Sequence, residues 1–279
     1  MSADAAGGEP MDAEFDVMPR WIAGAVAALG TDHAIPAACR GSVGPAGLAW
    51  LADHTHLGPG SVLVDVGGGM GGPAAWARHE RGAVPVVVEP QPGACAAARR
   101  MFDLPVAVAT GTAVPVADAA APVVWCLGVV CTTEAKARLV HELRRIVAPG
   151  GRVGLFVLVA RGEVVDAPEG NSFPTDVEVA ALLTGAGLDA DAAVDVADLP
   201  AAPRDWQDRA DAADDLVRDR HGDDAAWTRM HEQEARLGRL LDSGAVAGRL
   251  VVARRPVADA APVSRSGAAS PAGRAATTR

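Results

Sequence analysis

Several features that mark common protein classes are scarce in this chain of 279 residues. Tyrosine is absent, aromatic residues make up 4%, and Lys136 is the single lysine among 25 basic residues. A formal net charge of −10 disfavours nucleic acid as a partner, because phosphate binding depends on clustered Lys and Arg. No apolar run approaches the roughly 20 residues that cross a bilayer, and the first residues lack a signal-peptide pattern. We therefore expect a cytoplasmic protein that binds neither nucleic acid nor membrane.

The cysteines also lack the spacing of known metal and disulfide motifs. They include no CxxC pair and no zinc-ligand pattern with His, so we expect no metal site. We predict that all four are reduced and behave as small apolar side chains. They are Cys39, Cys95, Cys126 and Cys131.

Composition divides the chain into three parts. Residues 1–16 are small, polar and acidic, and are predicted to be flexible. Residues 257–279 are mostly Ala, Ser, Pro and Arg without apolar periodicity, and are predicted to be disordered. Residues 17–256 are expected to form one domain. That domain starts with a helical cap at 17–60 and carries a charged helical insertion at 204–243.

Between the cap and the insertion, short apolar runs alternate with helical stretches. The runs are continuous in Val, Leu and Ala, which is typical of strands covered by helices on both faces. This alternation predicts an α/β fold with a doubly wound, mostly parallel sheet. The expected strands cover residues 61–66, 85–90, 106–110, 122–130, 151–160, 191–200 and 245–256. The expected helices outside the cap and insertion cover 73–81, 93–102, 134–147 and 174–188.

The strongest motif is VLVDVGGGMGG at 62–72. An apolar strand leads into a loop of five glycines, and a helix then begins at Pro73, a residue favoured in the first turn. Glycines let the backbone turn sharply and approach a ligand closely. We therefore predict that this loop, with Gly67, Gly69 and Gly71, binds a cofactor. The alternative is a tight structural turn without a ligand.

Two acids accompany the loop. Glu89 ends the next expected strand, where a carboxylate can accept hydrogen bonds from both hydroxyls of an adenosine ribose. Asp65 lies two residues before the first glycine. Its charge would repel the pyrophosphate of a dinucleotide but attract the ammonium and sulfonium groups of S-adenosylmethionine. The loop also satisfies the GxGxxG pattern of NAD(P)-dependent oxidoreductases, so that class stays as an alternative.

The string DVGGGMG, from Asp65 to Gly71, resembles the D/E-x-G-x-G-x-G loop of class I S-adenosylmethionine-dependent methyltransferases. Glu89 is similar to their ribose-binding acid, and VHELRRIVAPGGRVGLF at 140–156 is similar to their helix, glycine turn and fifth strand. The sequence GGPA after the loop is similar to that of small-molecule methyltransferases. The resemblance covers about residues 40–256. It implies a seven-stranded sheet of order 3-2-1-4-5-7-6 with an antiparallel last strand.

The resemblance also implies an activity, the transfer of a methyl group from S-adenosylmethionine to a small-molecule acceptor. A specialised metabolite is one candidate acceptor. Leu127, beside Cys126 at the end of the fourth strand, would then lie next to the methionine moiety. Two positions depart from the family. Thr110 stands where many relatives have an Asp that recognises the adenine amino group. Pro122 stands where an Asp is common at the start of the fourth strand. These departures leave open a protein that binds the cofactor without turnover.

Segments outside the sheet are expected to supply the acceptor site. The candidates are 31–45, 168–175 and the insertion 204–243, which we predict to be a lid. The alternative for the insertion is a solvated helical hairpin on the outer face of the sheet. Arg40 is a candidate partner for the carboxylate of the cofactor's methionine moiety, with a structural role as the alternative.

Methyl transfer needs a general base only when the acceptor must first lose a proton, and His is the commonest base. His33 and His221 lie in the candidate acceptor segments and are therefore the predicted catalytic residues. A surface or packing role is the alternative for each.

Overall fold

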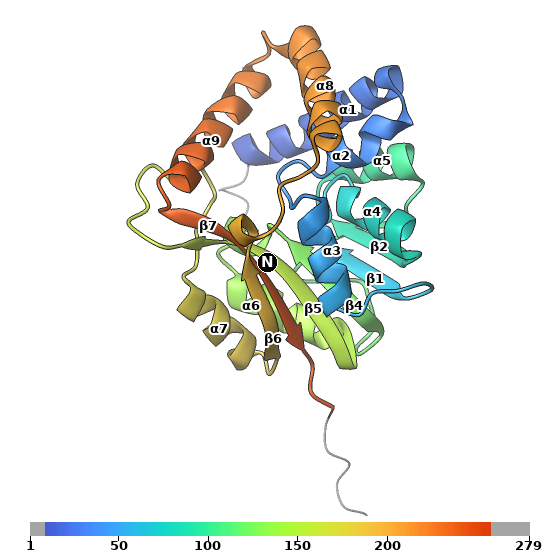
Figure 1. Ribbon diagram of the computed structural model, residues 1–279, viewed down its shortest axis with the longest axis vertical. Helices are drawn as coiled ribbons and strands as arrows, with labels where there is room; N and C mark the ends of the chain where they lie inside the picture. The colour runs from blue at the N-terminus through green and yellow to red at the C-terminus, as the bar shows by residue number, and fades with distance from the viewer. Residues whose placement is uncertain (1–8, 258–279) are drawn as a thin grey trace, which may run out of the picture.

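The computed structural model describes residues 9–257, and a seven-stranded sheet lies at its centre (Figure 1). The strand order is β3-β2-β1-β4-β5-β7-β6, and β7 runs antiparallel to both of its neighbours while the other pairs are parallel. The predicted doubly wound fold and its strand order are confirmed. The strands are β1 Val62–Val66, β2 Val84–Glu89, β3 Val106–Val108, β4 Ala121–Leu127, β5 Val147–Ala160, β6 Asp189–Asp195 and β7 Val246–Arg254.

Apolar side chains on both faces of the sheet build separate cores. Successive residues of a strand point to opposite faces, so Leu63 of β1 joins one buried cluster while Val64 and Val66 join the other. The first cluster includes α3 and α4, and the second includes α6 and α7. This double burial explains why the strands read as continuous apolar runs. These helices are α3 Pro45–His54, α4 Gly72–Arg81, α6 Lys136–Ile146 and α7 Asp176–Gly185.

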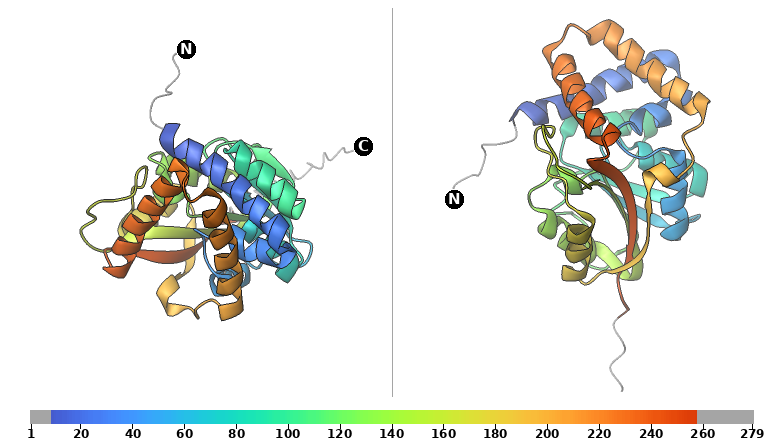
Figure 2. Two further views of the ribbon diagram at one scale, coloured as in Figure 1. Left: turned by 90° about the horizontal axis from the view of Figure 1, so that it is seen from above. Right: turned by 60° about the vertical axis from the view of Figure 1, so that its left-hand side comes forward.

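A group of four helices lies over the carboxyl edge of the sheet (Figure 2). From here on the name cap refers to these four helices, and no longer to residues 17–60. Two of its helices precede β1, and the other two form the predicted insertion between β6 and β7. Helix α8 packs on α1 and α2. No helix in residues 9–257 has both the length and the apolar character of a membrane span. The cap consists of α1 Glu9–Leu29, α2 Ala34–Ala38, α8 Arg204–His221 and α9 Ala225–Asp242.

Helix α1 begins within the segment 1–16 that was predicted to be flexible. Its first residue is Glu9. Asp16 has a structural partner: its carboxylate accepts a hydrogen bond from the backbone N–H of Gly93, in the first turn of α5 (Pro92–Phe102). A carboxylate at a helix N-terminus stabilises that helix. The rest of the predicted N-terminal segment and the predicted tail beyond Val257 lie outside the described residues.

Candidate functional site

The predicted cofactor residues meet at one edge of the sheet. Asp65 lies near the end of β1, Glu89 ends β2, Thr110 follows β3, and Leu127 ends β4. These four strands are neighbours, and ligands of open α/β sheets bind beside the carboxyl ends of the strands. The structure thus brings together positions that are spread over more than sixty residues of sequence.

The loop after β1 has the backbone that its glycines predicted. Gly67, Gly69 and Gly71 have φ angles of 72°, 54° and 79°, in the left-handed region that residues with a Cβ rarely adopt. At Gly68 the reason is space, because a Cβ would lie 2.8 Å from Oδ2 of Asp65. The loop therefore folds tightly around the Asp65 carboxylate.

The Asp65 carboxylate is a buried anion without a partner. The residue has no exposed surface, and neither carboxylate oxygen has a hydrogen-bond donor. Burial, and to a lesser degree the charge of Glu89, raises the pKa of Asp65 to about 7. A buried carboxylate without a hydrogen-bond donor destabilises the folded protein, and a ligand that supplies a donor would offset this effect. A cationic group with N–H donors, such as the ammonium of S-adenosylmethionine, fits this requirement.

Glu89 is held by the glycine loop itself. The backbone N–H of Gly69 donates to Oε2 at 2.9 Å, and the N–H of Gln91 donates to Oε1 at 3.0 Å. Burial raises the pKa of Glu89, and these two hydrogen bonds offset part of that shift. Each oxygen keeps a second acceptor position. A fixed carboxylate with two open acceptor positions suits a pair of ribose hydroxyls.

The two remaining predicted cofactor positions differ in exposure. Thr110 is exposed, with its Oγ1 3.3 Å from the Oγ1 of Thr112. Leu127 is buried at 9% exposure, and the strand ends there, earlier than expected, because Gly128 turns the chain with a φ of 81°. The site is thus polar and open beside β3 but apolar and closed beside β4.

Arg40 has partners that the sequence did not predict. Its guanidinium makes ion pairs with Asp211 and Asp214 of α8, the second with an Nε–Oδ2 distance of 2.7 Å. The two acids are three residues apart and therefore lie on one face of the helix. Burial raises the pKa of Asp214 to about 6, although Arg40 opposes that shift. The guanidinium thus contacts carboxylates of the cap, which is the structural alternative for this residue.

The two candidate bases both lie in the cap. His33 is in a short 3-10 turn between α1 and α2, and its Nδ1 is buried without a hydrogen-bond partner. His221 ends α8, and its ring stacks on Trp21 of α1, with centroids 4.3 Å apart and planes 7° from parallel. The stacking gives His221 a packing contact, and its catalytic role stays a prediction.

Apolar side chains from distant segments pack on one buried cluster, which includes Leu127 at the end of β4. Phe173, Trp206 and Leu237 pack against the buried cluster that contains Leu127 and Phe156. They come from the loop after β5, the start of α8 and the second half of α9. Segment 31–45 contributes Cys39 and Val43 to the same cluster, so all three predicted acceptor segments meet on the cluster that contains the predicted methionine contact.

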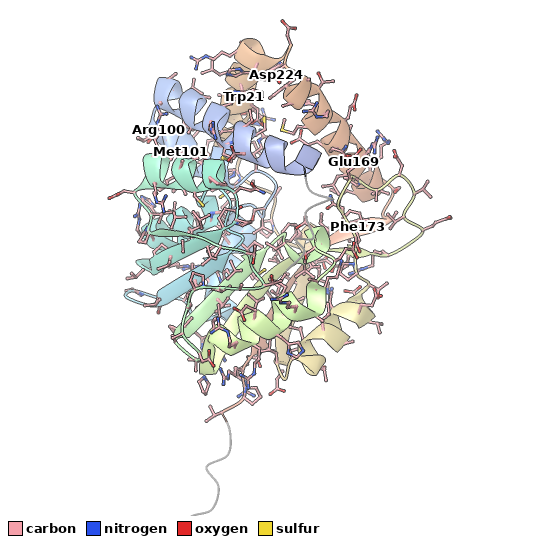
Figure 3. The ribbon with its side chains drawn as sticks, turned by 180° about the vertical axis from the view of Figure 1, so that it is seen from behind. Trp21, Arg100, Met101, Glu169, Phe173 and Asp224 are labelled. Carbon is pink, nitrogen blue, oxygen red and sulfur yellow. The ribbon has the colours of Figure 1, made fainter. Side chains whose placement is uncertain are left out.

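The loop after β5 is tied to α9. The backbone N–H of Glu169 donates to Oε1 of Gln233 at 2.9 Å, and Arg239 pairs with Asp166 at 3.0 Å. Figure 3 shows Glu169 and Phe173 on this loop, on the side of the molecule where α9 descends. These polar contacts connect the loop to the cap.

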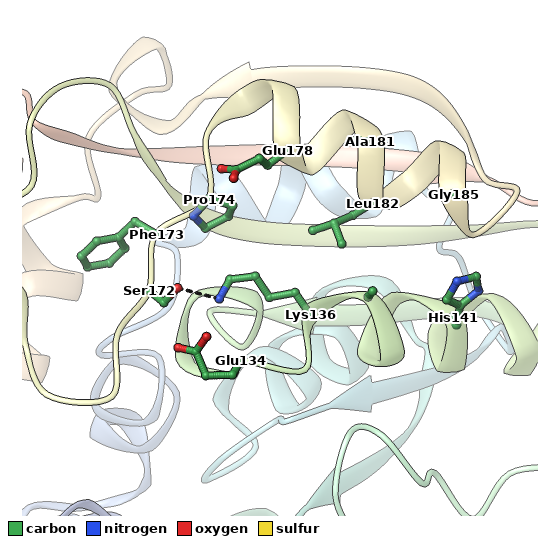
Figure 4. Close-up of a pocket in the computed structure, with 11 residues that line it drawn as sticks. Glu134, Lys136, His141, Ser172, Phe173, Pro174, Glu178, Ala181, Leu182 and Gly185 are labelled. Atoms are coloured by element: carbon green, nitrogen blue, oxygen red, sulfur yellow. Dashed lines mark hydrogen bonds between the residues drawn. The ribbon is translucent and has the colours of Figure 1, made fainter.

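A separate groove lies between α6 and α7 (Figure 4). In it, Nζ of Lys136 donates to Oγ of Ser172 at 2.9 Å and to the carbonyl oxygen of Thr133 at 2.7 Å. Phe173 contributes to its lining, but none of the predicted cofactor residues does. The lining of the groove is therefore distinct from the predicted cofactor residues.

Sequence reasoning missed the contact between α2 and α8. The sequence did contain one indication of this contact. Asp211 and Asp214 are three residues apart, so they can face one partner from the same side of the predicted helix. The partner, Arg40, lies about 170 residues earlier in the chain, so no local pattern could connect them.

Comparisons with known proteins agree with this geometry. Residues 64–155 match the model of a family described as a methyltransferase domain. No curated protein matches the chain. Among solved structures, the [4+2]-cyclase SpnF has a TM-score of 0.59 at 21% identity, covering 75% of this chain and 80% of that one.

Two further structures are of methyltransferases. Geranyl diphosphate C-methyltransferase from Streptomyces coelicolor A3(2), in complex with Mg²⁺, geranyl diphosphate and S-adenosyl-L-homocysteine, has a TM-score of 0.53 at 17% identity, with 75% of this chain and 78% of that chain covered. Phosphoethanolamine N-methyltransferase 2 from Haemonchus contortus, in complex with S-adenosyl-L-methionine, has a TM-score of 0.57 at 15% identity, with 75% and 52% covered.

The family match spans the glycine loop, Glu89, Thr110 and Leu127, and the sheet order is the one that the resemblance implied. The alternative of a nicotinamide-dependent oxidoreductase has no support from these comparisons. Residues 64–155 are thus a methyltransferase domain by their family match, and the described chain has the fold of class I S-adenosylmethionine-dependent methyltransferases.

Proposed function

We propose that this methyltransferase acts on a small, largely apolar acceptor that binds between the cap and the carboxyl edge of the sheet. The observation that carries the cofactor half of this proposal is the Asp65 carboxylate, fully buried beside the glycine loop without a hydrogen-bond donor. A specialised metabolite is the class of acceptor that we would test first.

S-adenosylmethionine supplies a methyl group already activated by a positively charged sulfur. The chain's own residues have to bind the cofactor, align the acceptor and exclude water. Asp65 would accept hydrogen bonds from the ammonium, and Glu89 would accept them from the ribose hydroxyls. Leu127 would form an apolar wall at the methionine end, and Thr110 would offer a hydroxyl near adenine.

The apolar character of the acceptor is inferred from side chains that pack on the same buried cluster as Leu127. Phe173, Trp206 and Leu237 supply an aromatic ring, an indole and a branched aliphatic group to one cluster. Ligand sites are mostly apolar with a few polar groups that fix orientation. An acceptor with a ring or chain skeleton and one polar atom to be methylated matches this surface.

Where the acceptor must lose a proton, His33 is the stronger of the two candidate bases. Its Nδ1 is buried and has no partner, whereas the His221 ring is stacked on Trp21. A base acts only within hydrogen-bond reach of its proton. The pH profile of turnover in His33→Gln would test this role against the same profile in His221→Gln.

Isothermal titration tests the cofactor half of the proposal. We expect heat of binding with S-adenosylmethionine and none with NAD or NADP. Asp65→Asn should weaken binding by about tenfold or more, since a charge-assisted hydrogen bond contributes roughly 1.5–3 kcal/mol. Asp208→Asn, on the exposed face of α8, is the matched control and should bind as the wild type does. Equal affinities in Asp65→Asn and the control would contradict the assignment.

Turnover tests the transfer itself. A panel of apolar small molecules bearing hydroxyl, amine or thiol groups would be incubated with S-adenosylmethionine, and S-adenosylhomocysteine would be measured together with the mass increase of one methyl group on the acceptor. Tight cofactor binding without product across a broad panel would favour the alternative of a binding protein without turnover.

A further inference from the structure

We propose that Arg40 is a positioning residue that couples occupancy of the cofactor site to closure of α8 and α9 over the acceptor. This inference rests on the proposed function, because it takes the glycine loop as the cofactor site. It assigns Arg40 to the contact between two parts of the cap instead of to the cofactor's carboxylate.

The first step is the contact between α2 and the cofactor loop. A Cβ placed on Gly72 would lie 2.5 Å from the carbonyl carbon and oxygen of Ala38 and 2.7 Å from the backbone nitrogen of Cys39. The end of α2 therefore rests backbone to backbone on the start of α4, directly after the glycine loop. Because packed interiors tolerate little displacement, a shift of this loop has to shift the end of α2.

The second step is the contact between Arg40 and α8. Arg40 is the second residue after α2, so its backbone moves with that contact. Its guanidinium spans Asp211 and Asp214, and a planar fork of this kind can engage two carboxylates at once. The side chain of Asp214 is two-thirds buried between the helices. The electrostatic surroundings of Asp214 also include His231 and Glu234 of α9. Arg40 thus brings a positive charge to an acidic cluster to which both insertion helices contribute.

The third step is the shallow apolar packing of α8. Its fully buried side chains, Ala210, Ala213 and Val217, are small, and its larger apolar side chains, Trp206 and Leu216, are only partly buried. Burial contributes about 25 cal/mol per Å² of apolar surface, so such a face holds a helix less firmly than large side chains would. The polar contacts with Arg40 consequently contribute much of what holds α8 in position. A movement of α2 can therefore move α8.

A coupling of this kind works in both directions. If the bound cofactor favours one position of the loop and α2, then Arg40 favours the closed position of α8. A closed α8 in turn favours the bound cofactor. The acceptor would therefore meet a completed site only after the cofactor has bound.

Hydrogen exchange with S-adenosylhomocysteine as the probe tests the coupling. In the wild type, amide protection along 204–221 should rise when this ligand is added, while β1 and β4 stay constant. In Arg40→Ala that rise should disappear, and ligand affinity should fall about five- to tenfold, within the usual range of coupling energies. Arg209→Ala removes an exposed ion pair within α8 and is the matched control, expected to behave as the wild type does.

A second pair of variants separates coupling from direct binding and guards against misfolding. In Asp211→Asn/Asp214→Asn, the guanidinium loses its charged partners but stays in place. If Arg40 acts through α8, adding Arg40→Ala to this background causes no further loss of affinity. If Arg40 binds the ligand's carboxylate, the added substitution weakens binding in this background as much as in the wild type, and the proposal is wrong.

The proposal is also overturned if Arg40→Ala retains the ligand-dependent protection of α8, or if the wild type shows none despite binding. Failure of the proposed function has a different signature, namely no heat of binding for S-adenosylhomocysteine in any variant. Arg40→Lys keeps one charge but not the fork, so its affinity and its protection should both lie between those of the wild type and Arg40→Ala.

Discussion

The pH dependence of cofactor affinity should be set largely by Asp65. Its pKa of about 7 means that the carboxylate is mostly neutral below neutrality, and a neutral carboxyl group attracts the ammonium of S-adenosylmethionine only weakly. Apparent affinity scales with the fraction of the protein in the competent form. At pH 5 that fraction is about 1%, so the dissociation constant should rise roughly tenfold for each pH unit below 7.

Isothermal titration of S-adenosylhomocysteine between pH 5 and 7.5 measures this slope. Asp65→Asn should bind more weakly at pH 7.5 and should lose most of the pH dependence. A smaller slope should remain, because burial also raises the pKa of Glu89. Identical slopes in the wild type and in Asp65→Asn would refute the reasoning, since the titrating group would then lie elsewhere.

The same carboxylate should limit the stability of the ligand-free protein. A folded pKa near 7 against an ordinary value of 3.8 means that the folded state binds the proton more tightly than the unfolded state does. Stability therefore falls as pH rises from about 4 to 7, by up to about 4 kcal/mol from this group alone. Denaturant unfolding at pH 5 and pH 8 should show about 3 kcal/mol of this loss in the wild type but a smaller one in Asp65→Asn. Saturating S-adenosylhomocysteine should restore part of it.

Three further outcomes are expected. Glu89→Gln should weaken S-adenosylhomocysteine binding by about tenfold in titration, because an amide has one acceptor oxygen where the carboxylate offers two. Thr55→Val should lower the free energy of unfolding by about 1–3 kcal/mol in denaturant titrations, since the buried indole N–H of Trp125 donates to Oγ1 of Thr55 at 3.4 Å. Deletion of residues 258–279 should leave the melting temperature unchanged, because their sequence has no apolar periodicity to bury; a drop of several degrees would show that this segment docks.

Much of the sheet and the cofactor edge could be predicted from local patterns. Continuous apolar runs identified the strands because both faces of the sheet are covered. The glycine loop and its two acids could be recognised because cofactor chemistry requires particular residue types at short spacing. Asp65 shows the limit of this reasoning. Its charge was predicted to matter, but its complete burial and the close approach of Gly68 to its carboxylate are properties of the folded loop.

The cap was harder to predict because its contacts join residues far apart in the chain. Asp16 belongs to an acidic segment with little apolar character, yet it lies in a helix and accepts a hydrogen bond from Gly93. Arg40 could be assigned equally well to a ligand or to the protein until Asp211 and Asp214 were placed beside it. In both cases tertiary contacts outweigh local propensity.

The insertion of α8 and α9 between two hydrogen-bonded strands has a consequence for how this enzyme could change its substrate. Asp195 at the end of β6 is paired with Arg249 near the start of β7, so the chain leaves the sheet and returns to it at adjacent positions. The hydrogen bonds between β6 and β7 do not depend on the segment that connects the two strands. The connecting helices could therefore be exchanged, lengthened or shortened as one unit while the glycine loop stayed intact. Evolution could thus vary the acceptor without rebuilding the part of the molecule that handles the methyl donor.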